Sequence, residues 1–137
     1  MLLVRTVILP SPIHGIGLFA DQFIPANTVI WQFDPKFDVG YTEEEFESLS
    51  PAAQLHVRKY SYFSAEMNLW ILCGDDARFM NHSDIPNTFE EPGTRTIALS
   101  DIHPGEEILC DYSQFDARSF AENDFTPTKK LVAGPGC

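Results

Sequence analysis

The segment Arg78-Phe-Met-Asn81-His82-Ser83-Asp84-Ile-Pro86-Asn87 is the most informative part of this sequence. It gathers asparagine, aspartate, serine and proline around only a few apolar side chains, and such residues favour local hydrogen bonds over regular structure. Asn81 and His82 together offer donors and acceptors that can hold a ligand bearing carboxylate, amine and purine groups. Taken by itself the segment is more typical of an ordered loop or short helical turn than of a ligand-binding site. Whether it binds a ligand therefore has to be judged together with the rest of the chain.

Two further segments contain glycine or polar residues that the packing of a hydrophobic core does not require. One is Ser11-Pro-Ile-His-Gly15-Ile-Gly17-Leu-Phe-Ala, whose glycine pair lets the backbone approach a ligand or adopt positive φ. Alone, that pair is more typical of a tight turn before a strand. The other is Pro104-Gly-Glu-Glu-Ile-Leu-Cys110-Asp-Tyr112, which alone is typical of a turn and a strand. The histidines show no HxxxH or HExxH spacing, so these segments predict no metal site.

Length and charge restrict the class of protein. The chain has 137 residues, about one domain, and its 44% hydrophobic and 12% aromatic content is typical of a globular protein. Only 9 Lys and Arg residues stand against 20 Asp and Glu residues, for a net charge of −11. Because binding to phosphate backbones needs clustered positive charge, no direct contact with nucleic acid is expected. A positively charged partner protein is more compatible with this net charge than nucleic acid is.

The cysteines and the N-terminus indicate the cellular compartment. The three cysteines, Cys73, Cys110 and Cys137, contain no CxxC pair, so reduced thiols are expected rather than a disulfide scaffold or a zinc site. The N-terminal segment lacks a cleavage pattern, and no apolar stretch approaches the ~18 residues of a membrane span. An intracellular protein, cytoplasmic or nuclear and not secreted, is therefore expected.

Short runs rich in β-branched and aromatic residues, separated by turns, predict strands. These runs are residues 2–9, 14–20, 28–33, 68–73, 88–91, 94–99 and 107–110. We expect 14–20 to pair with 28–33, and 88–91 to form a hairpin with 94–99. Thr42 with Glu45 is a capping box that predicts one short helix, and Ser50-Pro51 predicts the start of a second. The expected class is mainly β with a few short helices.

Together and in this order, the three segments resemble the SET-domain protein lysine methyltransferases. The motifs of that family stand here as Gly15-Ile-Gly17-Leu-Phe-Ala, Arg78-Phe-Met-Asn81-His82-Ser83 with Pro86-Asn87, and Gly105-Glu-Glu-Ile-Leu-Cys-Asp-Tyr112. The resemblance covers roughly residues 3–116. It implies a SET fold of small curved β-sheets with a C-terminal pseudoknot that brings Asn81 and His82 beside Tyr112. The implied domains are a SET domain over 1–116 and a C-terminal tail over 117–137 without zinc-binding cysteines.

The resemblance also implies a reaction, transfer of a methyl group from S-adenosylmethionine to a lysine ε-amine of a basic protein such as a histone. Tyr112 would be the catalytic residue that orients the methyl group and the amine. The residues implied in cofactor binding are Gly15, Ile16, Gly17, Tyr62, Arg78, Asn81 and His82. The residues implied in lining the substrate channel are Phe33, Cys110 and Phe115. The small Cys110 would leave room for dimethylation or trimethylation.

The chain departs from the family pattern at Asp84 and in its tail, which lacks the zinc-binding cysteines. Asp84 stands where many members have a zinc-binding cysteine, so no zinc is expected. In its place, Phe115, Phe120 and Phe125 are expected to fold back over the body and close the channel. A homodimer is among the expected partners, since a neighbouring copy could complete the channel of so small a domain. Two other functions stay open: a catalytically silent SET-like module that binds a basic peptide, and an assembly protein that uses its acidic surface.

Overall fold

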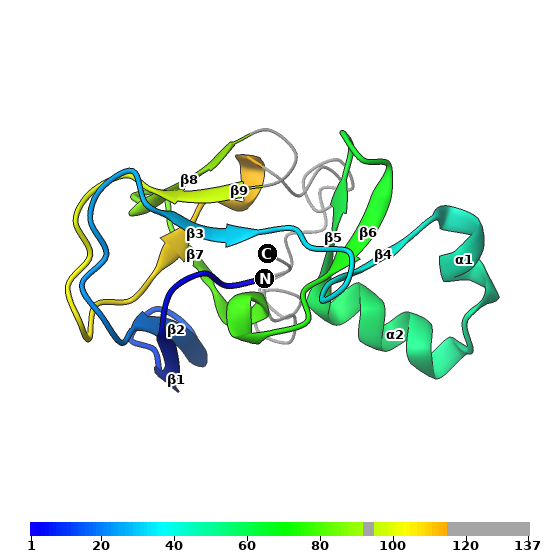
Figure 1. Ribbon diagram of the computed structural model, residues 1–137. Helices are drawn as coiled ribbons and strands as arrows, with labels where there is room; N and C mark the ends of the chain where they lie inside the picture. Colours follow the sequence, from blue (N-terminus) through cyan, green and yellow to red (C-terminus); the bar gives the residue numbers. More distant parts are fainter. Residues whose placement is uncertain (92–94, 115–137) are drawn as a thin grey trace.

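Small β-sheets joined by short helices make up residues 1–91 and 95–114, the part of the chain that the computed structural model describes (Figure 1). In this part the strands form two two-stranded and two three-stranded sheets. The predicted mainly β class with a few short helices is confirmed. No helix of these residues is long and apolar enough to cross a membrane.

The first sheet is a hairpin of β1 (Thr6–Pro10) and β2 (Ile16–Ala20), paired antiparallel. The predicted strand over 2–9 is therefore wrong at both ends, since residues 2–5 lie outside β1 and Leu2 forms an isolated bridge with Trp31. Pro10 belongs to the strand because β1 lies at the edge of its sheet, where a residue without an N–H is tolerated.

A three-stranded sheet has the order β3 (Val29–Gln32), β9 (Arg95–Ala98), β8 (Thr88–Glu91). The hairpin predicted from 88–91 and 94–99 is confirmed by the antiparallel pairing of β8 with β9. The predicted pairing of 14–20 with 28–33 is wrong, because β2 pairs with β1 while β3 pairs with β9. The turn at residues 25–27 thus leads from one sheet into another instead of closing a hairpin.

The other three-stranded sheet carries both α-helices at one end of the molecule (Figure 1). Its order is β4 (Val39–Tyr41), β6 (Leu69–Leu72), β5 (Ser61–Ser64). The helices are α1 (Glu43–Ser48) and α2 (Pro51–Tyr60), and both predicted N-terminal caps are confirmed. Strands β4 and β5 were not predicted. β5 follows α2 without any glycine or proline to mark the boundary.

Two buried clusters form the core. The smaller one lies between the helices and the β4–β6–β5 sheet, where Phe46 stacks on Trp70 with ring centroids 5.2 Å apart. The larger one runs through the rest of the molecule and includes Trp31, Met80 and Cys110, with Tyr112 packed against it. The tyrosine of the third motif is therefore anchored in the main core.

The last sheet joins β7 (Asn81–His82) to β10 (Leu109–Cys110) in parallel. The 3₁₀-helices η1 (Asp76–Phe79) and η2 (Tyr112–Gln114) flank these strands. The predicted strand over 107–110 is shorter because Glu107 and the N–H of Ile108 bond to β2 instead. Parallel strands need a long crossover, and here the crossover contains the whole β8–β9 hairpin. The second and third motifs meet as a result.

Candidate functional site

Asn81 holds the three motifs together. Asn81 is 3% exposed, and its Nδ2 lies 3.0 Å from the His14 carbonyl oxygen, 3.3 Å from the Ile16 carbonyl oxygen and 2.8 Å from Oε1 of Glu107. An amide nitrogen has only two protons, so these three acceptors share them. The buried amide therefore fixes both the glycine segment and the C-terminal strand against β7.

Gly17 makes room for the Glu107 carboxylate. A Cβ at this position would lie 2.1 Å from Oε1 of Glu107 and 3.0 Å from Cβ of Ser11. The other carboxylate oxygen accepts a hydrogen bond of 2.9 Å from the Ser11 hydroxyl. Gly15 has a different reason to be glycine, since its φ of +45° lies in the left-handed region and open space surrounds it. Gly17 is thus favoured by the partly buried Glu107 carboxylate, and Gly15 is favoured by a backbone bend.

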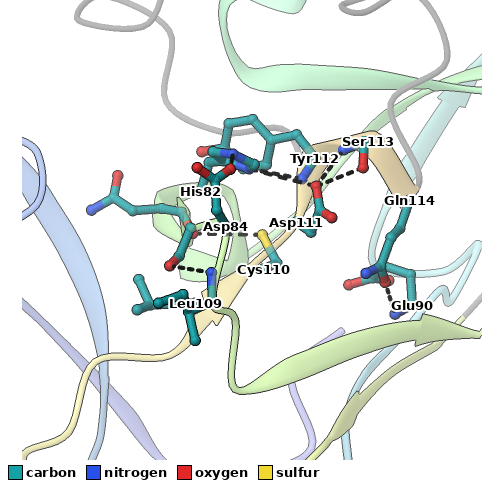
Figure 2. A network of polar contacts seen from close by, with 12 residues as sticks. His82, Asp84, Glu90, Leu109, Cys110, Asp111, Tyr112, Ser113 and Gln114 are labelled. Atoms are coloured by element: carbon teal, nitrogen blue, oxygen red, sulfur yellow. Dashed lines mark hydrogen bonds and ion pairs between the residues drawn. The ribbon is translucent and has the colours of Figure 1, made fainter.

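His82 and Tyr112 form the centre of the site (Figure 2). The backbone N–H of Tyr112 donates to Nδ1 of His82 at 3.1 Å, and the two ring centroids are 5.0 Å apart. Because Nδ1 accepts, the ring proton lies on Nε2, 3.1 Å from Oδ1 of the exposed Asp84. The Tyr112 hydroxyl donates to the Met80 carbonyl oxygen at 3.0 Å. The expected proximity of Asn81, His82 and Tyr112 is present.

Asp111 adds a fixed negative charge beside this pair. Burial alone would raise the pKa of its carboxyl, but hydrogen bonds from the Ser113 hydroxyl and N–H, at 2.7 and 2.9 Å, lower that pKa below its usual range. The electrostatic interaction with His82, whose Nδ1 is 3.8 Å from the carboxylate, also acts to lower this pKa. Asp111 therefore stays ionised at neutral pH.

Asn87 clamps the C-terminal strand from the other side. Its Nδ2 donates to the Glu107 carbonyl oxygen at 2.8 Å, and its Oδ1 accepts from the Leu109 N–H at 2.8 Å. The Thr88 hydroxyl donates to the Leu109 carbonyl oxygen at 2.8 Å. Asn87 and Glu107 both lie inside the sequence motifs, but neither was predicted to be a site residue. In Gly105-Glu106-Glu107, no local sequence feature shows that Glu107, and not Glu106, points towards Asn81.

The remaining residues expected to bind the cofactor occupy different environments. Tyr62 lies in β5, 5% exposed and inside the main core, whereas Ile16 begins β2 and is exposed. The Arg78 guanidinium carbon lies 5.4 Å from the centroids of both the Tyr60 and Phe79 rings. Its Nε is buried and has no hydrogen-bond partner among the described residues.

Two of the residues expected to line the substrate channel pack in the core. Phe33 follows β3 and packs against the main cluster. Cys110 has no exposed surface, and its Sγ lies 3.8 Å from the Asn81 carbonyl oxygen. Phe115 lies outside the described residues, as do Phe120, Phe125 and the tail over 117–137.

One titratable group near the site was not anticipated. Burial raises the pKa of the Glu90 carboxyl from its ordinary 4.5 to about 7, while a hydrogen bond from Thr96 acts in the opposite direction. No group of three or more His, Cys, Asp or Glu side chains that could hold a metal ion is found within residues 1–91 and 95–114.

The SET domain family matches residues 15–113. Among solved structures, a Plasmodium falciparum protein assigned as a histone methyltransferase has 24% identity and a TM-score of 0.58, over 80% of this chain and 93% of that one. A humanized mutant of the Chaetomium thermophilum Polycomb Repressive Complex 2, bound to the inhibitor GSK126, has 21% identity and a TM-score of 0.60.

That second likeness covers 82% of this chain but only 15% of the Polycomb chain. An apo form of ctPRC2 with mutations in Ezh2 has 19% identity and a TM-score of 0.63, over 98% of this chain and 20% of the other. At these identities the structural likeness shows the fold alone. The family match spans most of the sequence, including all three motifs. The chain therefore belongs to the SET domain family, as the resemblance of its motifs indicates.

Proposed function

We propose that this protein transfers a methyl group from S-adenosylmethionine to the ε-amine of a lysine in a basic protein. The observation that carries the proposal is the parallel pairing of β7 with β10, which sets Tyr112 against His82 and leaves Asn81 bonded to the glycine segment. Residues of three separate motifs thereby converge on one place.

The residues present fit this cofactor. The buried Nε of Arg78, which lacks a partner among the described residues, fits an acceptor such as the carboxylate at the methionine end. The open space beside Gly15 leaves its backbone accessible to a ligand. We infer that Arg78, the backbone at Gly15 to Gly17, and the Asn81-His82 pair hold the cofactor, with Tyr62 beneath them.

S-adenosylmethionine supplies an electrophilic methyl group on a positively charged sulfur. The Tyr112 hydroxyl donates to the Met80 carbonyl oxygen, and these two oxygen atoms orient the methyl group and the incoming amine. A free lysine has a pKa of about 10.4, so neutral amine at pH 7.4 costs roughly 4 kcal/mol. The apolar surroundings that Phe33 and the main core supply lower the pKa of the lysine and reduce this cost.

The charge around the site supports a basic substrate. Asp84 is almost fully exposed next to His82, and Asp111 is held ionised on its other side. With a net charge of −11 over the whole chain, these carboxylates attract a lysine-bearing basic segment and speed its encounter with the site. A second copy of the chain is a further proposed partner, which sedimentation analysis would detect as a dimer.

Calorimetry and mass spectrometry test the proposal with one matched variant, Tyr112→Phe. Wild-type protein should bind S-adenosylmethionine and transfer labelled methyl groups to lysines in a mixture of basic proteins. The variant should retain cofactor affinity within about twofold, because only a hydroxyl is removed, and lose methyl transfer by about 100-fold or more. Absence of cofactor binding, or transfer that ignores the substitution, contradicts the proposal. Binding of basic peptide alone would instead indicate a silent module.

The small Cys110 bears on how many methyl groups are added. Its thiol contacts the Asn81 carbonyl in the core beside the site, where a larger aromatic side chain would fill more space. We propose that dimethylated and trimethylated lysine are both accessible products. Mass spectrometry after long incubation should show them, and a product that stays monomethylated contradicts the idea.

A further inference from the structure

Three side chains form one cross-strand row on the sheet of β3, β9 and β8. Trp31 lies opposite Thr96, and Thr96 lies opposite Glu90. Side chains directly opposite one another in a sheet point to the same face, so all three share it. Trp31 and Thr96 are each 1% exposed, so the row lies on a buried face of the sheet.

The same face turns toward the segment that carries Tyr112. Thr88 is two residues before Glu90 in β8, so both side chains lie on one face, and the Thr88 hydroxyl bonds to Leu109 in β10. The Glu90 N–H donates to Oε1 of Gln114 at 3.0 Å, and Gln114 belongs to the same 3₁₀-helix as Tyr112 (Figure 2). The row therefore lies on the face of the sheet that contacts β10, next to the segment that carries Tyr112.

The Glu90 carboxylate has fewer hydrogen-bond donors than it can accept. Its oxygens lie 2.8 and 2.9 Å from a single donor, the Thr96 hydroxyl, which has one proton for both. None of the ion pairs among the described residues involves Glu90. In the same row, the buried Trp31 indole N–H has no partner within the described part of the chain. A carboxylate with only one donor can accept further hydrogen bonds from a ligand.

We propose that the Glu90 carboxylate binds the ammonium group of the substrate lysine and accepts one of its protons before methyl transfer. This inference rests on the function proposed above. In the step, one N–H bond of the ammonium breaks, an O–H bond forms on Glu90, and the electron pair stays on nitrogen. That pair then forms the bond to the methyl carbon, while the pair of the broken carbon–sulfur bond stays on sulfur. The proton on Glu90 is released to water.

The environment of Glu90 suits this role. A carboxyl with a pKa of about 7 is close to half ionised at neutral pH, and its gap to the lysine value of about 10.4 is narrower than for an ordinary glutamate. The other charged groups on the elements packed around it are Glu91, Arg95 and Asp111. Glu91 and Arg95 pair with each other on the opposite face, and Asp111 is held by Ser113.

Peptide binding tests the ammonium site without requiring turnover. The variants are Glu90→Gln, which keeps the shape, and Glu91→Gln as the control on the next residue and the opposite face. Calorimetry with S-adenosylhomocysteine present would compare short basic peptides containing one lysine with the same peptides containing norleucine, which lacks the ammonium. Wild type and Glu91→Gln should prefer lysine by about tenfold or more, and Glu90→Gln should bind both alike. A wild-type protein that does not distinguish the two peptides overturns the inference, even if it methylates lysine.

The pH profile of kcat/KM tests the proton transfer. Wild type and Glu91→Gln should lose activity below a pKa near 7, and this limb should be absent in Glu90→Gln together with a drop of about 100-fold or more. A limb that persists in Glu90→Gln refutes Glu90 as the proton acceptor. If lysine preference depends on Glu90 but no methyl is ever transferred, the proposed function fails while the ammonium site stands.

Discussion

Replacing Gly17 by alanine should disrupt the site through Glu107 and not through the backbone. The added methyl carbon would lie 2.1 Å from Oε1 of Glu107, far inside any tolerated contact. The carboxylate has to move, and its hydrogen bonds with the Asn81 amide and the Ser11 hydroxyl are lost or weakened. Asn81 keeps the two carbonyl acceptors of the glycine segment, so the fold should persist in a destabilised form.

The expected loss follows from these contacts. A hydrogen bond to a charged acceptor contributes about 1.5 to 3 kcal/mol, and the partly exposed Ser11 bond contributes at the lower end of the usual range, about 0.5 kcal/mol. The free energy of unfolding should therefore fall by roughly 2 to 3 kcal/mol. For a domain of this size, that corresponds to a decrease in Tm on the order of 10 °C. Affinity for S-adenosylmethionine should fall as well, because Asn81 loses part of its support.

Urea unfolding of four proteins tests the reasoning: wild type, Gly17→Ala, Glu107→Ala and the double variant. With Glu107 shortened, the clash with its carboxylate is gone and only the 3.0 Å contact with Cβ of Ser11 remains, so Gly17→Ala should cost about 1 kcal/mol, which gives a coupling energy of roughly 1 to 2 kcal/mol. Gly15→Ala is the control, since its added carbon meets open space and only the positive φ costs about 1 kcal/mol. Additive losses in the double variant would refute the account.

Three other changes have defined outcomes. Asn87→Ala should lower the free energy of unfolding by about 2 to 3 kcal/mol in urea, because two backbone groups of the C-terminal strand lose their partner. Since the pKa of Glu90 is raised on folding, its contribution to stability is present below pH 4.5 and lost as pH rises through about 7. The free energy of unfolding of Glu90→Gln, relative to that of wild type, should therefore rise by roughly 3 kcal/mol between pH 4.5 and 8. A difference that stays constant over this pH range would contradict the prediction. Thr42→Ala should cost about 1 kcal/mol by removing the capping box of α1, with no change in cofactor affinity.

Local signals predicted the elements whose ends are marked by residues of special chemistry. Thr42 and Ser50 act as helix caps because their hydroxyls satisfy backbone donors within three residues, a distance that a sequence shows directly. Partner strands are not marked in this way. The run 14–20 has the composition of a strand whichever partner it takes, and it lies against residues 6–10 because the chain between them is short. β5 was missed because its aromatic residues continue from a helix without a break.

The site was predictable only as far as its motifs were known. That Asn81, His82 and Tyr112 come together follows from the parallel pairing of two two-residue strands, which no periodicity can reveal. The roles of Glu107 and Asn87 could not be predicted for a related reason, since their partners are distant in sequence. Glu107 contacts Gly17 and the Asn81 amide, and Asn87 bonds to backbone groups of the C-terminal strand. In the sequence Glu90 looks like an ordinary hairpin glutamate, and only the cross-strand row with Thr96 and Trp31 shows that its carboxylate faces the core.

The polar residues near Tyr112 divide into two kinds by what their contacts do. Asn81, Asn87 and Glu107 bond to segments that are far apart in the sequence, so the same hydrogen bonds hold the fold and shape the site. Their substitution must change stability and ligand binding together. The Glu90 carboxylate bonds to Thr96 on the neighbouring strand of its own hairpin and to no distant segment among the described residues. Because folding gains little from this carboxylate and burial disfavours its charge, its presence is best explained by the substrate.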